Sequence, residues 1–266
     1  MPHRYHNIQW IIQQNLTNSS DLEQLKAACD NIGVRYQEVM VIPFTETLPA
    51  FDRSYRSIFY GSVTFSQMAL AEPSVSDGLF MDNVAFSIEN YFEHWGRHML
   101  NYGAILTTFE ALVQMDLPAD KLYFIRPDDD HKSFAGEVKS FGDIGTWYGQ
   151  LKETTISPDS RIVVSEPYNI RYEWRLWIVH QKVVAASKYR EYFQLTKERG
   201  CPEEVVRFAE ARCREYTPHD VFVMDICRCG DEYFIVECGC MNSAGFYAAD
   251  IAAIVTAVTD YFAGKK

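Results

Sequence analysis

The sequence predicts an α/β protein in which helices and strands alternate near the N-terminus and strands dominate the second half. Three observations support this fold class: a helix-strand alternation within residues 20–65, a series of strand-like segments between residues 121 and 240, and an amphipathic segment at the C-terminus. With 266 residues, of which 47% are hydrophobic, the chain can bury a large core and form two lobes.

The N-terminal third contains one well-marked helix. Ser20-Asp21-Leu22-Glu23 resembles a capping box, apolar residues follow at helical spacing, and Gly33 ends the pattern. The apolar face is expected to comprise Leu22, Leu25, Cys29 and Ile32.

Two strands are expected after this helix. The first covers residues 36–42 and ends at Pro43, and the second covers residues 57–65, where Gly61 allows another backbone to come close. Residues 73–82 are expected to form a loop. Helical periodicity then returns in residues 83–99 and 103–115. We therefore expect residues 1–118 to form a small α/β lobe with linking helices.

The remainder of the chain is rich in strands. Strands are expected in residues 121–127, 160–168 and 172–190 and in a hairpin within residues 224–247, with one helix over residues 202–216. The last helix has one apolar face and ends at Gly264. That face consists of Ile251, Ile254, Val255, Val258 and Phe262.

Charge and composition exclude several classes of protein. A net charge of −11 disfavours generic binding to nucleic acid or to an anionic membrane. The sequence has no apolar stretch of roughly 18 residues, as a membrane span requires, and no signal-peptide pattern at its start. Seven cysteines, an odd number, favour reduced thiols and a cytoplasmic location.

The hairpin carries an unusual pair of acids. If its turn is centred on Asp231, Asp225 and Glu237 lie opposite each other and point to the same sheet face, as do Cys229 with Tyr233 and Cys227 with Ile235. Two such carboxylates repel each other unless a cation or a proton neutralises them. A divalent cation such as Mg²⁺ would satisfy both, and the alternative is a pair held by arginines or by solvent at a strand end.

The cysteines of the hairpin do not favour a zinc site. Cys227 and Cys229 share the face of Asp225, whereas Cys238 and Cys240 are expected to point away from it. C-x-C pairs are also not the usual spacing of zinc ligands. These cysteines are therefore expected to be small buried hydrophobic residues.

The order of the segments resembles the ATP-grasp superfamily. The resemblance rests on a basic strand ("YFIRP"), a loop, a strand ending in Glu-Pro, a strand with E-x-R, and then "D-x(11)-E" and "NSAGFY". It covers Lys121 to the C-terminus and is strongest for a divergent branch with arginine in place of the first nucleotide-contacting lysine. It implies an ATP-grasp domain over residues 119–266, in which two β-rich lobes enclose ATP.

The resemblance implies a nucleotide site. Arg126 takes the place of the strand lysine near the α-phosphate, and Lys132 that of the loop lysine near the β-phosphate. Glu166 and the backbone of Pro167 and Tyr168 are expected to meet the adenine edge. The alternatives are a strand-end salt bridge for Arg126, a solvated charge for Lys132, and a simple strand terminator for Glu166.

Charged residues on two neighbouring strands are further candidates. "YEWRLWIV" alternates, so Glu173 and Arg175 share one face, and a charged pair in so apolar a strand needs a polar cavity. The resemblance directs Arg175 at the γ-phosphate or an acyl-phosphate, and Glu173 at Arg175 or the ribose. Lys188 and Arg190, two residues apart on one face, are expected to hold an anionic substrate. The alternatives are a mutual ion pair for the first two residues and exposed edge charges for the others.

Asp225 and Glu237 match the two magnesium-binding acids of the family. The usual asparagine two residues after the glutamate is replaced by Gly239, so Asn242 is the candidate for the third ligand or for a substrate contact. The implied activity is an ATP- and Mg²⁺-dependent ligase that joins a small-molecule or peptide carboxylate to an amine, or to a thiol, through an acyl-phosphate. The alternatives are a non-catalytic ATP-binding module and a small-molecule kinase. The sequence has no P-loop motif, which argues against a P-loop NTPase.

Overall fold

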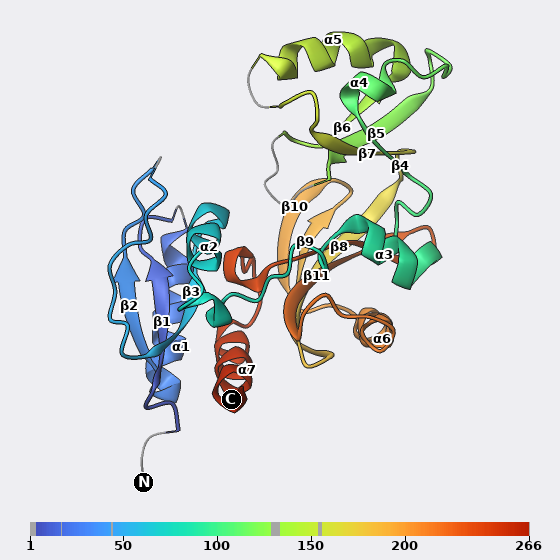
Figure 1. Ribbon diagram of the computed structural model, residues 1–266. Coiled ribbons are helices and arrows are strands. Elements are labelled where there is room, and N and C mark those ends of the chain that lie inside the picture. Colours follow the sequence, from blue (N-terminus) through green and yellow to red (C-terminus); the bar gives the residue numbers. More distant parts are fainter. Residues whose placement is uncertain (1–3, 17, 44, 129–133, 154–155, 266) are drawn as a thin grey trace.

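The computed structural model describes residues 4–16, 18–43, 45–128, 134–153 and 156–265. It confirms the α/β class. Within these residues the strands form three sheets, with the orders β2-β1-β3, β4-β7-β5-β6 and β10-β9-β8-β11-β12 (Figure 1).

The N-terminal lobe is built on the first sheet, which is parallel. Its strands are β1 (Ile8–Gln13), β2 (Arg35–Val39) and β3 (Arg56–Tyr60), and its helices are α1 (Ser19–Ile32) and α2 (Val63–Leu70). The last element of the chain, α7 (Ile251–Gly264), packs against α1 and shares one apolar core with β1 (Figure 1). The two ends of the sequence therefore stabilise each other.

The middle lobe contains an antiparallel sheet and two helices. Its strands are β4 (Ile105–Thr108), β5 (Leu122–Pro127), β6 (Glu137–Ser140) and β7 (Arg161–Ser165), and its helices are α4 (Phe109–Leu112) and α5 (Phe141–Lys152). Figure 1 shows this lobe at the top, apart from the N-terminal lobe. Its core, which includes Phe109, Ile144 and Trp147, draws only on residues between 109 and 164 among its buried members.

The third sheet is antiparallel and forms the floor between the other two lobes. Its strands are β8 (Ile170–Val179), β9 (Lys182–Glu191), β10 (Gln194–Arg199), β11 (Val221–Cys229) and β12 (Glu232–Gly239). One face packs on α3 (Ile88–Trp95) and α6 (Glu203–Cys213) through Trp174, Leu176 and Ile178. On the opposite face Trp177 and Val179 join the N-terminal core. Three short 3-10 helices complete the fold, η1 (Ser76–Gly78), η2 (Gly96–His98) and η3 (Met241–Ser243).

The helix predictions at the two ends of the chain are largely confirmed. Helix α1 ends at Gly33, which adopts the left-handed conformation with φ of 70°, and all five apolar residues of the α7 face are buried. The predicted capping box is wrong, because α1 begins one residue earlier and its N-cap, Asn18, makes no side-chain cap bond.

Several boundaries differ from the prediction. The strand expected over residues 57–65 ends at Tyr60, and helix α2 begins at Val63 behind the N-cap Ser62. Gly61 does allow a close approach, since an added Cβ would lie 2.7 Å from Gln13 Oε1. The helix expected over residues 103–115 is instead strand β4 followed by the short helix α4. Strands β1 and β6 and helix α5 were not predicted.

The sheets also place two segments differently from the expected division at residue 118. Strand β4 precedes that position but pairs with β7, so the middle sheet starts at Ile105. Helix α7 follows it but packs into the N-terminal lobe. In the part of the chain that the structure describes, no helix is long and apolar enough to cross a membrane.

Candidate active site

A cavity of about 820 Å³ lies between the middle lobe and the third sheet. The middle lobe contributes Phe124, Arg126 and Gly136, and the link between the lobes contributes Ser165, Pro167 and Tyr168. The floor contains the charged residues of the third sheet, Glu173, Arg175, Arg190, Asp225 and Glu237. A volume of this size is typical of a small-molecule or cofactor site.

The two acids of the hairpin are opposite each other, as predicted, but the turn differs. Cys229 pairs with Glu232, so the turn is the two-residue Gly230-Asp231, in which Gly230 has φ of 61°. The pairings predicted for Cys227 and for Cys229 are therefore wrong. Val236 is an extra residue in β12, and this bulge restores the register so that Asp225 faces Glu237.

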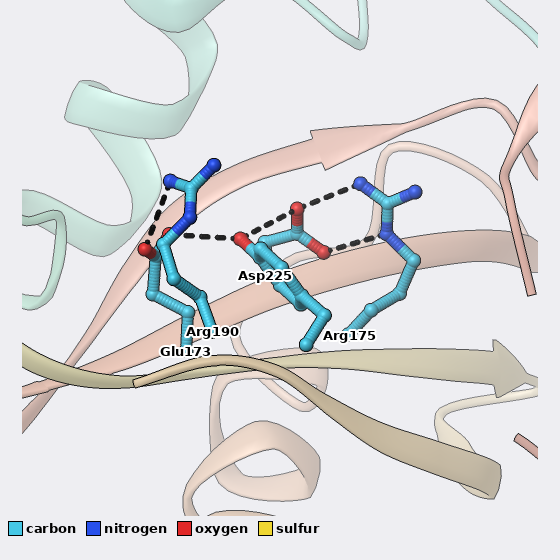
Figure 2. A network of polar contacts seen from close by, with 5 residues as sticks. Glu173, Arg175, Arg190 and Asp225 are labelled. Atoms are coloured by element: carbon cyan, nitrogen blue, oxygen red, sulfur yellow. Dashed lines mark hydrogen bonds and ion pairs between the residues drawn. The ribbon is translucent and has the colours of Figure 1, made fainter. Parts of the chain in front are cut away.

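Asp225 is neutralised by an arginine on the neighbouring strand. Arg175 Nε and Nη2 each donate a hydrogen bond of 2.8 Å to the Asp225 carboxylate, which is 2% exposed (Figure 2). Burial would lower the pKa of Arg175, but the Asp225 carboxylate outweighs it and the pKa is raised. One of the alternatives from the sequence, an acid held by arginine, therefore applies to Asp225. Arg175 is directed at this acid rather than into open space.

A second ion pair crosses the same sheet. Arg190 Nη1 donates to Glu173 Oε1 at 3.0 Å, and Tyr189 donates to Glu173 Oε2 at 2.8 Å (Figure 2). The Tyr189 hydroxyl also lies 3.3 Å from Asp225 Oδ2, so it joins the two ion pairs. Burial raises the pKa of Glu173, and the positive charge of Arg190 opposes that shift. Glu173 thus orients Arg190 and Tyr189, whereas the expected contacts were Arg175 and the ribose.

A bulge in β9 separates Lys188 from Arg190. Arg190 pairs with Glu173 and Lys188 pairs with Trp174, which leaves Tyr189 as the extra residue. Lys188 therefore shares the face of Trp174, where it forms ion pairs with Glu191 and Glu198. The prediction that Lys188 and Arg190 share one face is wrong, and only Arg190 lines the cavity.

Asn242 has a structural role in the N-terminal lobe. Its side chain is 0% exposed and donates to the carbonyl oxygens of Phe59 and Gly78, at 2.7 and 2.8 Å. Its Oδ1 accepts a hydrogen bond of 2.8 Å from the backbone N–H of Phe80. The amide is engaged within the lobe and does not line the cavity, so the expectation of a metal ligand or substrate contact is corrected here.

The residues expected around the nucleotide are partly brought together. Arg126, Pro167 and Tyr168 line the cavity. Glu166 is exposed and forms an ion pair of 2.8 Å with Lys121, outside the cavity wall. Lys132 lies outside the described residues.

Three cavity residues were not predicted. Tyr247 adopts a positive φ of 53° and stacks on Tyr189 with ring centroids 4.8 Å apart, and the Arg175 guanidinium lies 5.2 Å from its ring centre. A strained backbone conformation of this kind is common at functional sites. Asn101 lies at the start of the middle lobe, and among the described residues its Oδ1 has no hydrogen-bond partner. The aromatic end of "NSAGFY" could have indicated Tyr247, whereas no local signal distinguishes Tyr189 or Asn101.

Asp225 and Glu237 are suitable for a hard cation. Carboxylate oxygens are the ligands that Mg²⁺ prefers, and the cation normally completes its coordination with water and phosphate oxygens. Within the described residues no three His, Cys, Asp or Glu side chains form a metal-binding group, so two protein acids are the donor set here. The Asp225 oxygens retain acceptor capacity beyond the bonds from Arg175, since an ionised carboxylate has about four lone-pair sites.

Solved structures with this fold are all distant in sequence. The crystal structure of D-cycloserine synthetase DcsG is 13% identical, covers 96% of this chain and 99% of its own, and has a TM-score of 0.68. The ATP-grasp ligase PsnB, complexed with a phosphomimetic precursor variant, Mg and ADP, is 10% identical, with coverages of 96% and 98% and a TM-score of 0.57. The RiPP-associated ATP-grasp ligase of Chryseobacterium gregarium, in complex with ADP and a leader and core peptide, is 10% identical, with coverages of 98% and 97% and a TM-score of 0.60.

Comparison with curated protein sequences finds no match. A family model of the ATP-grasp domain, the third family of its clade, matches residues 84–258, which include α3, the middle lobe, the whole third sheet and the first turns of α7. This match covers most of the chain and both walls of the cavity, and it agrees with the fold of the solved structures. The chain belongs to this family of the ATP-grasp superfamily.

Proposed function

We propose that this protein is an ATP- and Mg²⁺-dependent ligase that joins a carboxylate to an amine, or to a thiol, through an acyl-phosphate. The observation that carries the proposal is the shared cavity, in which Arg126 of the middle lobe and the Asp225–Glu237 pair of the third sheet line one space. The complexes of related folds with ADP, one of them with Mg, support the same nucleotide for this chain.

Each end of the cavity has its own task in this proposal. Arg126 supplies a planar fork of donors for phosphate oxygens, and the link at Pro167 and Tyr168 offers backbone groups to the base. Asp225 and Glu237 hold Mg²⁺, which when bound neutralises charge on the outer phosphates. Arg175 adds a positive charge beside these acids.

The reaction has two displacements. A carboxylate oxygen of the substrate bonds to the γ-phosphorus while the bond from phosphorus to ADP breaks. The amine nitrogen then bonds to the acyl carbon, phosphate leaves with the electron pair of the broken C–O bond, and the amine proton passes to phosphate or solvent. The residues of the cavity position the reactants and neutralise charge, since phosphoryl transfer needs little covalent help from the protein.

The test is ADP release from ATP and Mg²⁺ with a panel of carboxylates and amines. The wild type should form ADP and an amide, and Asp225→Ala and Glu237→Ala should each lower the rate about 100-fold or more, because metal charge stabilisation contributes several kcal/mol. Glu232→Ala, an exposed acid on the same hairpin, is the matched control and should keep full activity. Full turnover in both acid variants would show that the metal assignment is wrong.

One observation favours a different class. Asp225 is bound twice by Arg175, and this guanidinium competes with a metal for the same carboxylate. A module that binds ATP without turnover would keep this pair intact. ATP binding without ADP formation for any acceptor pair would support that class, and ADP formation without an amide would support a kinase.

A further inference from the structure

A second cavity, of about 640 Å³, adjoins the first. The two cavities share Arg175, Asp225, Glu237 and Asp128, so a ligand in the second cavity would lie beside the charged floor of the first. The second cavity then extends away from the nucleotide side, to helix α2 and to residues 239–244. Its position next to the acid pair is suitable for the molecule that reacts with ATP.

One wall of this cavity is apolar. The wall contains Val63, Leu70, Ala71, Leu79, Met81 and Val223. Gly239 lies in the same wall, and a Cβ added there would lie 3.4 Å from Val223 Cγ2, an ordinary van der Waals contact. The missing side chain at Gly239 therefore leaves space in the cavity that a larger residue would occupy.

The charged residues form two groups of different sign balance. In the first group, Arg161 Nη2 lies 2.9 Å from Asp128 Oδ2 and also contacts Glu89, so two acids share one arginine. The Asp128 side chain is only 10% exposed, which strengthens its attraction for a positive charge. This group attracts a cation such as an ammonium.

In the second group, Arg175 balances Asp225, and Glu237 lies opposite Asp225 on β12. A divalent cation on the two acids would balance both of them and leave the Arg175 guanidinium as the excess positive charge. This group then attracts an anion such as a carboxylate, so the cavity favours an ammonium at one end and a carboxylate at the other.

We propose that the second cavity binds a small amino acid with an apolar side chain, with its carboxylate toward Arg175 and its ammonium toward Asp128 and Glu89. This inference rests on the proposed function, because the carboxylate beside Arg175 is the group that would receive the γ-phosphoryl. The volume is suitable for a small molecule rather than a protein segment. The surplus of acids at the Arg161 end disfavours a substrate with a second carboxylate.

The first experiment is calorimetric titration of the full chain, with Mg²⁺ and a non-hydrolysable ATP analogue present. The probes are alanine, valine, leucine and methionine, each as both enantiomers, together with glutamate. At least one apolar amino acid should bind, and its N-acetyl and amide derivatives should each bind about tenfold more weakly or worse, because each loses one charge-assisted contact. No binding by any apolar amino acid, or equal binding of the N-acetyl form as expected for a peptide C-terminus, would overturn the inference.

Two pairs of variants locate the site. Gly239→Val should abolish binding of the amino acid and leave binding of the ATP analogue unchanged, because Gly239 lines only the second cavity. Gly245→Val is the matched control, since Gly245 is exposed, has no atom within 4 Å of an added Cβ and lines neither cavity. If Gly239→Val does not fold, Ala71→Phe, at an exposed position of the same cavity, takes its place.

The outcomes separate the two proposals. Binding of the ATP analogue without binding of any apolar amino acid overturns the inference and leaves the proposed function to the ADP assay with other acceptors. Failure to bind the ATP analogue at all overturns the proposed function, and the inference with it. Unchanged amino acid binding in both cavity-filling variants would place the amino acid elsewhere and overturn the inference alone.

Discussion

Two buried asparagines differ in how far their amides are satisfied. Asn242 is 0% exposed and bonds to three backbone groups. Asn101 is 6% exposed and lines the nucleotide cavity, and its Oδ1 has no partner among the described residues. A buried acceptor without a partner costs about 1–3 kcal/mol, so a ligand N–H or O–H at Asn101 would recover that free energy on binding.

Asn101→Ala should therefore separate stability from binding. We expect its free energy of unfolding to stay within about 0.5 kcal/mol of the wild type, while its affinity for an ATP analogue falls about 5- to 30-fold. Asn242→Ala, the matched control, should lose about 1–3 kcal/mol of stability, because it leaves backbone groups without partners. Urea denaturation and calorimetric titration measure both quantities. A destabilised Asn101→Ala with unchanged nucleotide affinity would contradict this assignment.

His219 makes the stability of the fold sensitive to acid. Its Nδ1 accepts a 3.0 Å hydrogen bond from the backbone N–H of Val221, which requires the neutral ring. Burial and the charge of Lys265 lower the pKa of His219 from its usual 6.5, although Asp220 and Asp82 oppose the shift. A lowered pKa means that the unfolded chain takes up a proton before the folded one, so this contribution is present above pH 6.5 and is lost as the pH falls through the folded value.

His219→Asn should remove that sensitivity, because an amide oxygen can accept the same hydrogen bond but does not titrate. We expect the wild type to lose stability more steeply than the variant below pH 6.5, by up to about 1.4 kcal/mol per pH unit. Urea denaturation of both proteins at several values between about pH 5 and about pH 8 measures the slopes. Parallel slopes would show that His219 is not the acid-sensitive group.

At the scale of elements, long periodic segments were predictable and short ones were not. The apolar face of α7 repeats over four turns and all of its members are buried. Strand β4 has four residues and helix α4 follows it directly, so no periodicity develops over either element. The sequence did contain a local signal at both missed helices: Ser62 caps α2 and Thr108 caps α4 through their side-chain oxygens.

The two bulges explain why the site was predicted only in part. Strict alternation placed Glu173 and Arg175 correctly on one face, because β8 is regular between them on the β11 side. In β9 the extra residue Tyr189 reverses the alternation, so Lys188 turns away from the cavity. In β12 the extra residue Val236 compensates for a shorter turn, and the acid pair was correct although the turn was not. Bulges depend on the partner strand, which a single strand's sequence does not contain.

Helix α7 offers a test of how it is held in the N-terminal lobe. Trp10 Nε1 in β1 donates a 3.0 Å hydrogen bond to Thr259 Oγ1, and both residues are 0% exposed. Thr259→Val should cost about 1–3 kcal/mol, because it keeps the shape but leaves the indole N–H without its partner. Thr256→Val is the control, since that threonine lies in the same helix, bonds to the carbonyl one turn earlier and is exposed at its hydroxyl. Equal urea denaturation midpoints for the two variants would refute the role of the buried bond.

At the scale of the whole molecule, the buried apolar residues form separate clusters. One joins the N-terminal sheet to α7 and part of the third sheet, and another lies between the third sheet and helices α3 and α6. The middle lobe has a cluster of its own. Lobes that share few buried contacts are expected to move relative to each other, and the proposed nucleotide cavity lies between the middle lobe and the third sheet.

Lobe closure over the nucleotide is the consequence that can be measured. Arg126 lies on one wall of the cavity and the acid pair on the other, so one Mg²⁺-nucleotide would attract both walls. We expect saturating Mg²⁺ with a non-hydrolysable ATP analogue to lower the radius of gyration in small-angle scattering toward the value of about 18 Å for a compact chain of 266 residues. Mg²⁺ alone is the control and should leave the radius unchanged, as should the nucleotide with Arg126→Ala if that residue links the nucleotide to the middle lobe. An unchanged scattering curve in the wild type, at a nucleotide concentration shown by calorimetry to be saturating, would mean that the lobes are already fixed and that substrates enter and leave without closure.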